Sequence, residues 1–146
     1  SEQIEAALQG AWGVDSELIR DGTYFVGVAD GVAVLCGGWS RRGTTFGGDA
    51  YAQRESRLLD PRCEAARIRA YFVHPDWARR GLATRLLGLC ESEAKAAGFT
   101  SAELVATLPG QRFYARHGYA AAEPRSYDLP GDLSIVFVPM QRQLGE

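Results

Sequence analysis

The sequence predicts an α+β fold with a mixed, mostly antiparallel twisted sheet, one parallel strand pair and helices on both faces. The antiparallel part is indicated by β-rich segments at 23–29 and 32–39, on either side of an Asp-Gly dipeptide that is a strong hairpin signal. A helical segment connects the strands expected at 67–73 and 101–106, so these two strands should be parallel neighbours. Together these segments predict a mixed sheet.

The first part of the chain supplies a helix, this hairpin and a long irregular segment. Acidic residues near the start and a glycine at the end predict a short helix over residues 1–10. Within the hairpin, Gly37 and Gly38 indicate a bulge or a close approach of two backbones. Residues 41–64 contain several glycines, a proline and charges of both signs, and loops of this length are usually functional or disordered.

The longest predicted helix follows the strand at 67–73, which ends at Pro75 because proline cannot donate a ladder hydrogen bond. Gly98 can adopt a positive φ and should end this helix. The apolar positions of the helix recur at three- and four-residue spacing, as in an amphipathic helix: Leu82, Leu86, Leu89/Cys90 and Ala94.

The C-terminal part predicts a shorter helix and a closing pair of strands. Pro109 suits the first turn of this helix, which should reach about His117 and end at Gly118. The closing strands are expected at 119–128 and 133–140, on either side of a Pro-Gly turn.

The composition is that of an ordinary globular protein. The 146 residues suffice for one domain with a real core, and 46% of them are hydrophobic and 23% charged. The net charge of −2 argues against a general nucleic-acid binder, and no run approaches the about 18 apolar residues of a membrane span. We therefore expect a cytoplasmic protein whose partners are neither nucleic acids nor membranes.

The three cysteines are odd in number and are not spaced as a metal site, so no metal is expected. Cys36 and Cys90 lie in apolar runs and are predicted to be small core residues. A reducing compartment suits this cysteine usage.

The stretch from 67 to 98 reads as a strand, a small basic loop and a helix, which together can bind phosphate. The first turn of a helix leaves backbone N–H groups unpaired and carries partial positive charge. Gly81 and Ala83 are small enough for an anion to reach this backbone, and Arg79 and Arg80 add full charges. The alternative is a tight, solvated connection between strand and helix.

Two motifs, at 73–87 and 113–119, resemble those of the GCN5-related N-acetyltransferase (GNAT) superfamily. V-H-P-D-W-A-R-R-G-L-A-T-R-L-L is similar to its acetyl-coenzyme A signature, (Arg/Gln)-x-x-Gly-x-(Gly/Ala). F-Y-A-R-H-G-Y is similar to its second conserved block, F-Y-x-x-x-G-(F/Y). The order of elements is also similar, and the resemblance covers roughly residues 24–144. It implies the GNAT, or acyl-CoA N-acyltransferase, fold.

The chain departs from the family pattern at three places. Ala78 stands where the signature usually has Arg or Gln, and Thr107 where many relatives carry Asn. Neither change touches the backbone amides of the loop. The family normally begins with a further strand and helix, so we expect residues 1–146 to be a single domain that lacks them.

The resemblance implies acetyl-coenzyme A (acetyl-CoA) as cosubstrate and no metal. The amides of the loop at 79–84 would hold the pyrophosphate, and the edge of the strand at 71–73 would pair with the pantetheine arm. The implied coenzyme-binding residues are Tyr71, Phe72, Val73, Arg79, Arg80, Gly81, Leu82, Ala83, Thr84 and Thr107.

The resemblance also assigns Tyr114 as the general acid that protonates the departing thiolate; the alternative is an aromatic core residue. Arg67 stands where histone-acetylating relatives carry a glutamate that acts as the general base. Glu103 on the adjacent strand is then the candidate base, directly or through water, although it could equally be a solvent-facing carboxylate. Such a base matters because an alkyl amine with a pKa near 10.4 is almost fully protonated at pH 7.

Four residues in or beside the long loop could line an acceptor pocket, with Asp49 attracting a cationic amine: Trp39, Phe46, Asp49 and Tyr51. Loop packing is the alternative. We expect direct transfer of an acetyl group to a primary amine of a small molecule or peptide in a ternary complex, with a homodimer possible. The alternatives are another acyl group or nucleophile, or a non-catalytic module that binds coenzyme A.

Overall fold

The computed structural model describes residues 16–44, 56–129 and 131–145. The helix expected at 1–10 and three predicted acceptor residues, Phe46, Asp49 and Tyr51, lie outside the described residues. The described elements are, in chain order, α2 (Ser16–Asp21), β1 (Tyr24–Ala29), β2 (Val32–Ser40), β3 (Ala66–Val73), the 3₁₀ turn η1 (Pro75–Trp77), α3 (Leu82–Ala96), β4 (Ser101–Ala106), α4 (Gln111–Arg116), β5 (Ala120–Ala121), β6 (Arg125–Leu129) and β7 (Leu133–Gln143).

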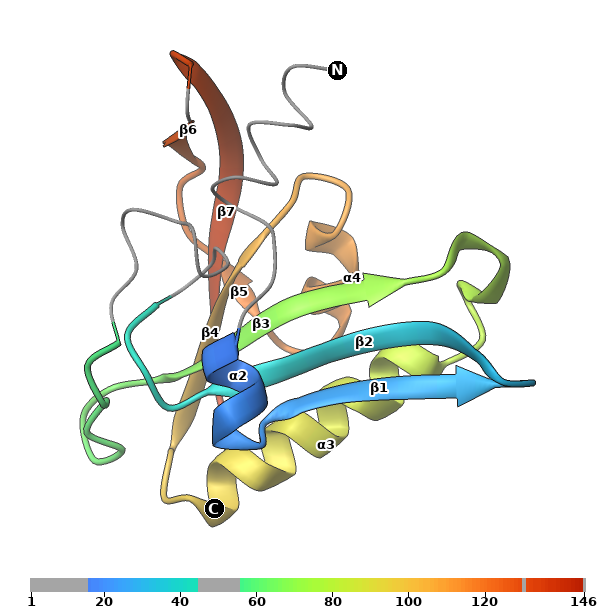
Figure 1. Ribbon diagram of the computed structural model, residues 1–146. Helices are drawn as coiled ribbons and strands as arrows, with labels where there is room; N and C mark the ends of the chain where they lie inside the picture. The colour runs from blue at the N-terminus through green and yellow to red at the C-terminus, as the bar shows by residue number, and fades with distance from the viewer. Residues whose placement is uncertain (1–15, 45–55, 130, 146) are drawn as a thin grey trace.

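The described strands form the predicted mixed sheet, in the order β1-β2-β3-β4-β7-β5, with β6 also paired to β7. β3 and β4 are parallel, and the other pairs are antiparallel. In Figure 1, α2 lies in front of β1 and β2 whereas α3 lies behind them, so helices cover both faces as predicted. The fold class is therefore confirmed.

The parallel pair is short. β3 and β4 are in register at two positions, Ala66 with Ala102 and Arg67 with Glu103. Beyond Arg67 the two strands have no registered pairs and diverge, as Figure 1 shows. By cleft we mean only this separation of the two strand backbones, and by its vertex the point where the paired part ends, at Arg67 and Glu103.

The hairpin between β1 and β2 follows the predicted turn chemistry. Asp30 and Gly31 both have positive φ, 51° and 76°, as a type I′ turn requires. A Cβ atom at Gly37 would lie 2.6 Å from Cδ2 of Tyr71, and one at Gly38 would lie 2.2 Å from the carbonyl oxygen of Thr23. A register shift also falls between Cys36 and Gly38. The prediction for this glycine pair, a bulge or a close approach of two backbones, is confirmed.

The main core lies between α3 and the sheet. α3 buries Leu86, Leu87, Cys90 and Ala94 against β-strand residues that include Trp39 and Ile68. Leu89 is 43% exposed, so the buried stripe runs through Leu87 instead. The helix ends at Ala96 with Ala97 as its C-cap, and the predicted terminating residue, Gly98, follows directly with a positive φ of 99°.

Four details differ from the sequence-based expectations. The sequence does not predict α2, which buries Leu18 and is held by Arg42, whose Nε and Nη2 donate to Asp21 at 2.9 and 3.0 Å. α4 begins two residues after Pro109, because Gly110 closes a turn by donating to the carbonyl oxygen of Thr107 at 3.0 Å. Cys36 is half-buried, not a core residue.

The fourth difference is in the strand expected at 119–128, which is divided into β5 and β6. Pro124 lies in the interruption, where it has no N–H group to donate to a neighbouring strand. β7 spans both pieces and also pairs with β4, so it joins the closing hairpin to the rest of the sheet.

Candidate functional site

The loop between β3 and α3 ends in an open helix N-terminus. Gly81 is the N-cap with φ of 80°, and within the described chain no side chain caps this end. The first helical hydrogen bond runs from the Arg85 amide to the Gly81 carbonyl oxygen, at 3.1 Å. The amides of the first turn of α3 precede that bond and have no helical acceptor. Together with the helix dipole they can hold an anion.

Three contacts fix the shape of this loop. The Tyr71 hydroxyl donates to the carbonyl oxygen of Ala83 at 2.6 Å, and Oγ1 of Thr84 lies 3.1 Å from Nε2 of His117. The Arg80 guanidinium lies 4.5 Å from the ring centroid of Trp77 and donates to the backbone of η1. The loop is thereby attached to β3, to the end of α4 and to its own 3₁₀ turn.

The two loop arginines differ in their freedom. Arg80 is stacked on an aromatic ring, whereas Arg79 is exposed, with a positive φ of 62°. A non-glycine residue in this region is uncommon and indicates a backbone shape set by the loop. Arg79 is therefore the better placed of the two to reach an external anion.

The cleft edge of β3 leads from the vertex toward this loop. On its other edge, β3 pairs with β2 through Phe72 with Cys36 and Val73 with Leu35. Beyond Arg67, the edge that faces β4 has no ladder partner within the described strands. An extended ligand could add to this edge as a further strand.

Three tyrosines cluster on the α3 side of the cleft. Ring centroids are 6.2 Å apart for Tyr71 and Tyr114, and 5.9 Å apart for Tyr114 and Tyr119. The Tyr71 hydroxyl is bonded to Ala83, and that of Tyr119 donates to Glu91 at 2.8 Å. For the Tyr114 hydroxyl, no hydrogen bond is found within the described residues. Burial raises the pKa of Tyr114 above its ordinary value, so the phenol keeps its proton at neutral pH.

The vertex of the cleft carries an ion pair on the opposite face. Nη1 of Arg67 donates to Oε1 of Glu103 and, at 3.1 Å, to the carbonyl oxygen of Ala65. Ile68 points into the core beneath α3, and successive strand residues alternate, so Arg67 points away from α3. Glu103 lies where the two strands separate, but its carboxylate is held by a guanidinium.

Trp39 requires a correction. It is 1% exposed in the main core, where its ring stands edge-on to Phe99 with centroids 6.1 Å apart. Its indole N–H donates to Oε1 of Glu93 on α3 at 3.0 Å. A side chain this deeply buried beneath α3 cannot line a pocket that is open to an acceptor. Thr107, which is predicted to bind the coenzyme, is exposed. Its hydroxyl oxygen accepts a hydrogen bond from the Gly110 amide at 3.2 Å.

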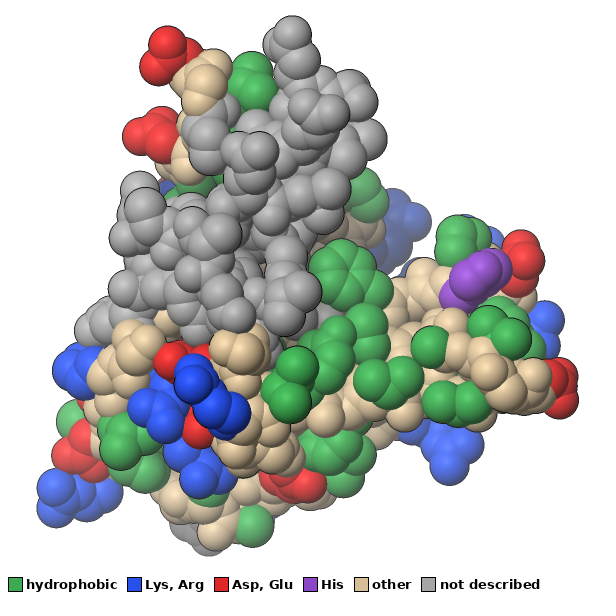
Figure 2. Space-filling model, viewed as in Figure 1, with side chains coloured by type: hydrophobic (Ala, Val, Ile, Leu, Met, Phe, Trp, Pro, Cys, Tyr) green, Lys and Arg blue, Asp and Glu red, His purple; other side chains and the backbone are tan. Residues whose placement is uncertain are grey.

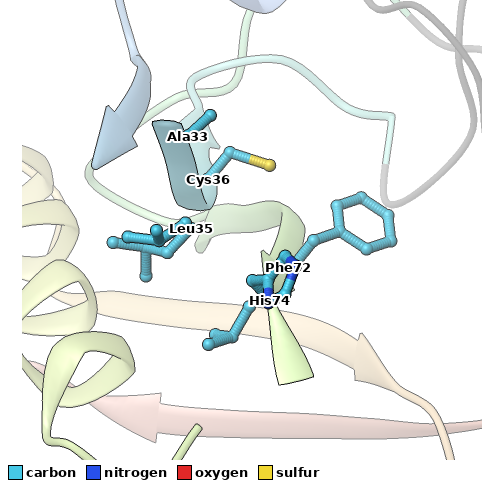
Figure 3. A pocket seen from close by; sticks show the side chains of 7 residues that line it. Ala33, Leu35, Cys36, Phe72 and His74 are labelled. Carbon is cyan, nitrogen blue, oxygen red and sulfur yellow. The ribbon is translucent and has the colours of Figure 1, made fainter. Parts of the chain in front are cut away.

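Away from the vertex, the face of β1–β3 that is opposite α3 is apolar. Figure 2 shows hydrophobic side chains gathered over these strands, and Val26, Val28 and Phe72 are each at least half exposed. An open cavity of about 260 Å³ lies here. Figure 3 shows the side chains that line it, which include Cys36, Phe72 and His74. This cavity lies over the paired segments of β2 and β3, away from the vertex, and its lining offers one imidazole and one thiol.

Neither a metal site nor a membrane-spanning helix is found in the part of the chain that the structure describes. No group of His, Cys, Asp and Glu within residues 16–44, 56–129 and 131–145 is arranged to hold a metal ion. None of the helices in those ranges has the length and apolar character needed to cross a membrane.

The motifs and the cleft together resemble one known domain. The family model described as an acetyltransferase (GNAT) domain matches residues 20–121, which is more than half of the chain and includes the loop and both motifs. The chain belongs to the GNAT acetyltransferase family. Its β3–α3 loop lies in the matched range and is called the GNAT loop below.

Solved structures of GNAT proteins share the fold. The GCN5-related N-acetyltransferase of Rhodopseudomonas palustris is 20% identical with a TM-score of 0.62, over 87% of this chain and 65% of that protein. The Salmonella typhimurium protein yncA, solved with its cofactor acetyl-CoA, is 17% identical with a TM-score of 0.63, over 90% of this chain and 70% of its own.

A third structure is the PaiA N-acetyltransferase of Thermoplasma acidophilum in complex with coenzyme A. It is 15% identical with a TM-score of 0.58, and the match covers 88% of this chain and 67% of that one. At such identities the likeness concerns the fold. The chain spans less than two thirds of the R. palustris protein. No curated protein matches the chain significantly.

Two features of the site are not predicted by the sequence. The sequence indicates only a helix end at His117, whereas its ring contacts Thr84 in the GNAT loop. The sequence identifies Arg67 as a replacement for glutamate, but the prediction does not include its pairing with Glu103. A signal for this pairing is present in the sequence. The strands at 67–73 and 101–106 are expected to be parallel neighbours, and Arg67 and Glu103 both lie near the start of their strands.

Proposed function

We propose that this GNAT domain binds acetyl-CoA and transfers the acetyl group to a primary amine of a small molecule or peptide. The observation that carries the proposal is the free edge of β3, which runs from the vertex to the open N-terminus of α3. An extended arm that ends in a pyrophosphate needs both parts, a strand edge and an anion site, in this order. Coenzyme A has that form.

The residues present fit this cosubstrate. The first-turn amides of α3, with Arg79 and Thr84, would hold the pyrophosphate, and the backbone of Tyr71 to Val73 would hold the pantetheine arm. A side chain at Gly81 would have space but would be strained at its positive φ, so glycine keeps the loop both open and relaxed. The cosubstrate supplies an activated thioester.

Tyr114 is the proposed general acid. Like any tyrosine it is protonated at neutral pH, burial raises its pKa further, and its hydroxyl has no competing partner within the described residues. Tyr71 and Tyr119, by contrast, already use their hydroxyl groups. This difference favours Tyr114 over its two neighbours, and a general acid typically contributes about 10²–10⁴-fold.

The proposed transfer is balanced in atoms and protons. The acceptor ammonium loses one proton, and its nitrogen then attacks the thioester carbonyl carbon. A carbon–nitrogen bond forms, the carbon–sulfur bond breaks, and the thiolate takes the Tyr114 proton. The nitrogen loses a second proton, which returns to Tyr114 through solvent, so the net reaction releases one proton. We propose that Glu103 accepts the first proton, the one lost by the acceptor ammonium, either directly or through water.

Two measurements test the proposal. Isothermal titration with acetyl-CoA should show binding, and an Arg79→Gln variant should bind more weakly than Arg125→Gln, a matched change on exposed β6. A thioester-consumption screen against amines, polyamines and peptide N-termini should then find an acceptor. Absence of acetyl-CoA binding would refute the proposal. Binding without turnover would support the alternative, a non-catalytic coenzyme-binding module, and turnover with oxygen nucleophiles alone would support another acyltransferase.

A further inference from the structure

We propose that the acceptor is an amino acid, bound as a zwitterion by the ion pair of Arg67 and Glu103 at the vertex of the cleft. This inference rests on the proposed function and adds the substrate class. The amine would take the place of Arg67 beside Glu103, and the carboxylate would bind Arg67.

The position of the pair supports this inference first. Arg67 and Glu103 form the last registered pair before β3 and β4 separate, so they stand where the free edge of β3 begins. They point away from α3, whereas the tyrosine cluster lies on the α3 side. A donor held from the Tyr114 side and an acceptor held from the ion-pair side would meet where the two strands separate.

The pair is also accessible to a ligand. The side chain of Glu103 is 32% exposed and that of Arg67 is 13% exposed. The carboxylate can therefore be reached from outside, while the guanidinium is mostly desolvated and would interact strongly with a ligand. The neighbours in register on this face are polar as well, Ser40 beside Arg67 and Gln141 beside Glu103.

Charge balance favours a zwitterion over a simple amine. A simple amine that bound Glu103 would leave the Arg67 guanidinium without its carboxylate, and leaving one member of a desolvated pair uncompensated is unfavourable. An amino acid would replace the ion pair of Arg67 and Glu103 with two others, its ammonium with Glu103 and its carboxylate with Arg67. Neither protein charge would then be left uncompensated. Arg69, the next cation on this face, is buried and has contacts of its own, so it is assigned no part.

Arg67 also has donor capacity to spare. Its Nη1 serves both Glu103 and Ala65, whereas its Nε is buried and has no hydrogen-bond partner within the described residues. A guanidinium has five N–H donors in a planar fork that suits a carboxylate. Acetylation removes the positive charge of the amine, so Glu103 can pair with Arg67 again, which favours release of the product.

The test compares matched acceptors. The purified protein with acetyl-CoA is assayed by thioester consumption against the common amino acids, and each accepted one is compared with its decarboxylated amine. We expect kcat/KM to be at least about 10-fold higher for the amino acid, the effect of losing one charge-assisted hydrogen bond. Acetylation of amines but of no amino acid, or equal kcat/KM for both, would overturn the inference while leaving the proposed function intact.

Variants assign the preference to the ion pair. Arg67→Gln should lower kcat/KM for the amino acid by about 10–100-fold, mainly through KM, and should raise it for the amine, because the amine no longer leaves an uncompensated guanidinium when it binds Glu103. Arg67→Lys should restore part of the preference, and Arg62→Gln, in an exposed ion pair with Asp60, is the matched control. If Arg67 had a purely structural role, Arg67→Gln would lower kcat/KM equally for the amino acid and for the amine. That result would also overturn the inference.

A charge swap guards against simple unfolding. Arg67→Glu combined with Glu103→Arg keeps an ion pair and should keep the melting temperature within a few degrees of wild type. It would present the amine and carboxylate positions in reverse, so amino-acid acetylation should be lost while acetyl-CoA binding in isothermal titration is retained. A swapped variant that binds acetyl-CoA and still prefers amino acids would contradict the inference.

Discussion

The hydroxyl of Tyr71 donates a 2.6 Å hydrogen bond to the carbonyl oxygen of Ala83, and this bond joins β3 to the first turn of α3. Tyr71 occupies the space that a side chain at Gly37 would fill. The strand that would hold the pantetheine arm and the turn that would hold the pyrophosphate are thus connected by one side chain. The missing side chain at Gly37 makes room for that connection.

Removing this hydroxyl should weaken binding of the coenzyme. We expect Tyr71→Phe to raise the Kd for acetyl-CoA about 2–10-fold in isothermal titration, because one hydrogen bond contributes about 0.5–1.5 kcal/mol. Tyr119→Phe is the matched control, since it removes a hydroxyl bonded to Glu91 within the same aromatic cluster. An equal change in both variants would show that the loop does not depend on the Ala83 contact.

Removing the Tyr114 hydroxyl should slow the chemistry and spare binding. We expect Tyr114→Phe to lower kcat on the order of 10²-fold, the typical contribution of a general acid, with the Kd for acetyl-CoA unchanged. Tyr127→Phe on β6, whose ring packs with Phe137 in a separate apolar cluster, should have wild-type kcat. Wild-type turnover by Tyr114→Phe would remove this residue from the mechanism.

Two glycines should respond oppositely to alanine. Gly37→Ala would place Cβ 2.6 Å from the Tyr71 ring and should destabilise the fold by about 1–3 kcal/mol, as overpacking does. Gly88 lies on the exposed side of α3, where an added Cβ would have no neighbour within 4 Å, so Gly88→Ala should stabilise by about 0.5–1 kcal/mol. Urea unfolding measures both changes, and a Gly37→Ala protein as stable as wild type would contradict the close packing.

Cys90 should contribute a pH-dependent part of the stability. Burial raises the pKa of its thiol from 9.0 to about 12. The unfolded chain releases this proton near pH 9 whereas the folded chain retains it, so the contribution is complete below pH 9 and is lost as the pH rises toward 12. Cys90→Ala should therefore show a smaller loss of unfolding free energy between pH 9 and 11 than wild type.

Labelling offers an independent check of the same thiol. In native protein at pH 8, iodoacetamide should modify exposed Cys63 and leave buried Cys90 unmodified until denaturant is added. Mass spectrometry of the peptides distinguishes the two. Rapid labelling of native Cys90 would mean that α3 opens more easily than its packing indicates.

Features that depend on neighbouring residues along the chain were determined by the sequence itself. The Asp-Gly turn, the glycine that ends α3 and the alternation of the strands follow from backbone preferences and periodicity, which act within a few residues. The parallel pair and the GNAT loop could likewise be predicted, because a strand–loop–helix–strand unit has few possible arrangements.

The tertiary structure decided which side chains are free to act. From the sequence, Trp39 could line an acceptor pocket or belong to the core. Its place in the core depends on α3, where Glu93, 54 residues away, accepts a hydrogen bond from its indole N–H. Tyr114 differs from Tyr71 and Tyr119 because those two hydroxyl groups find partners on other elements. Arg67 and Glu103 meet because the strands are still paired at their positions and diverge beyond them. Burial and pairing depend on which distant surfaces meet, and local pattern does not contain that information.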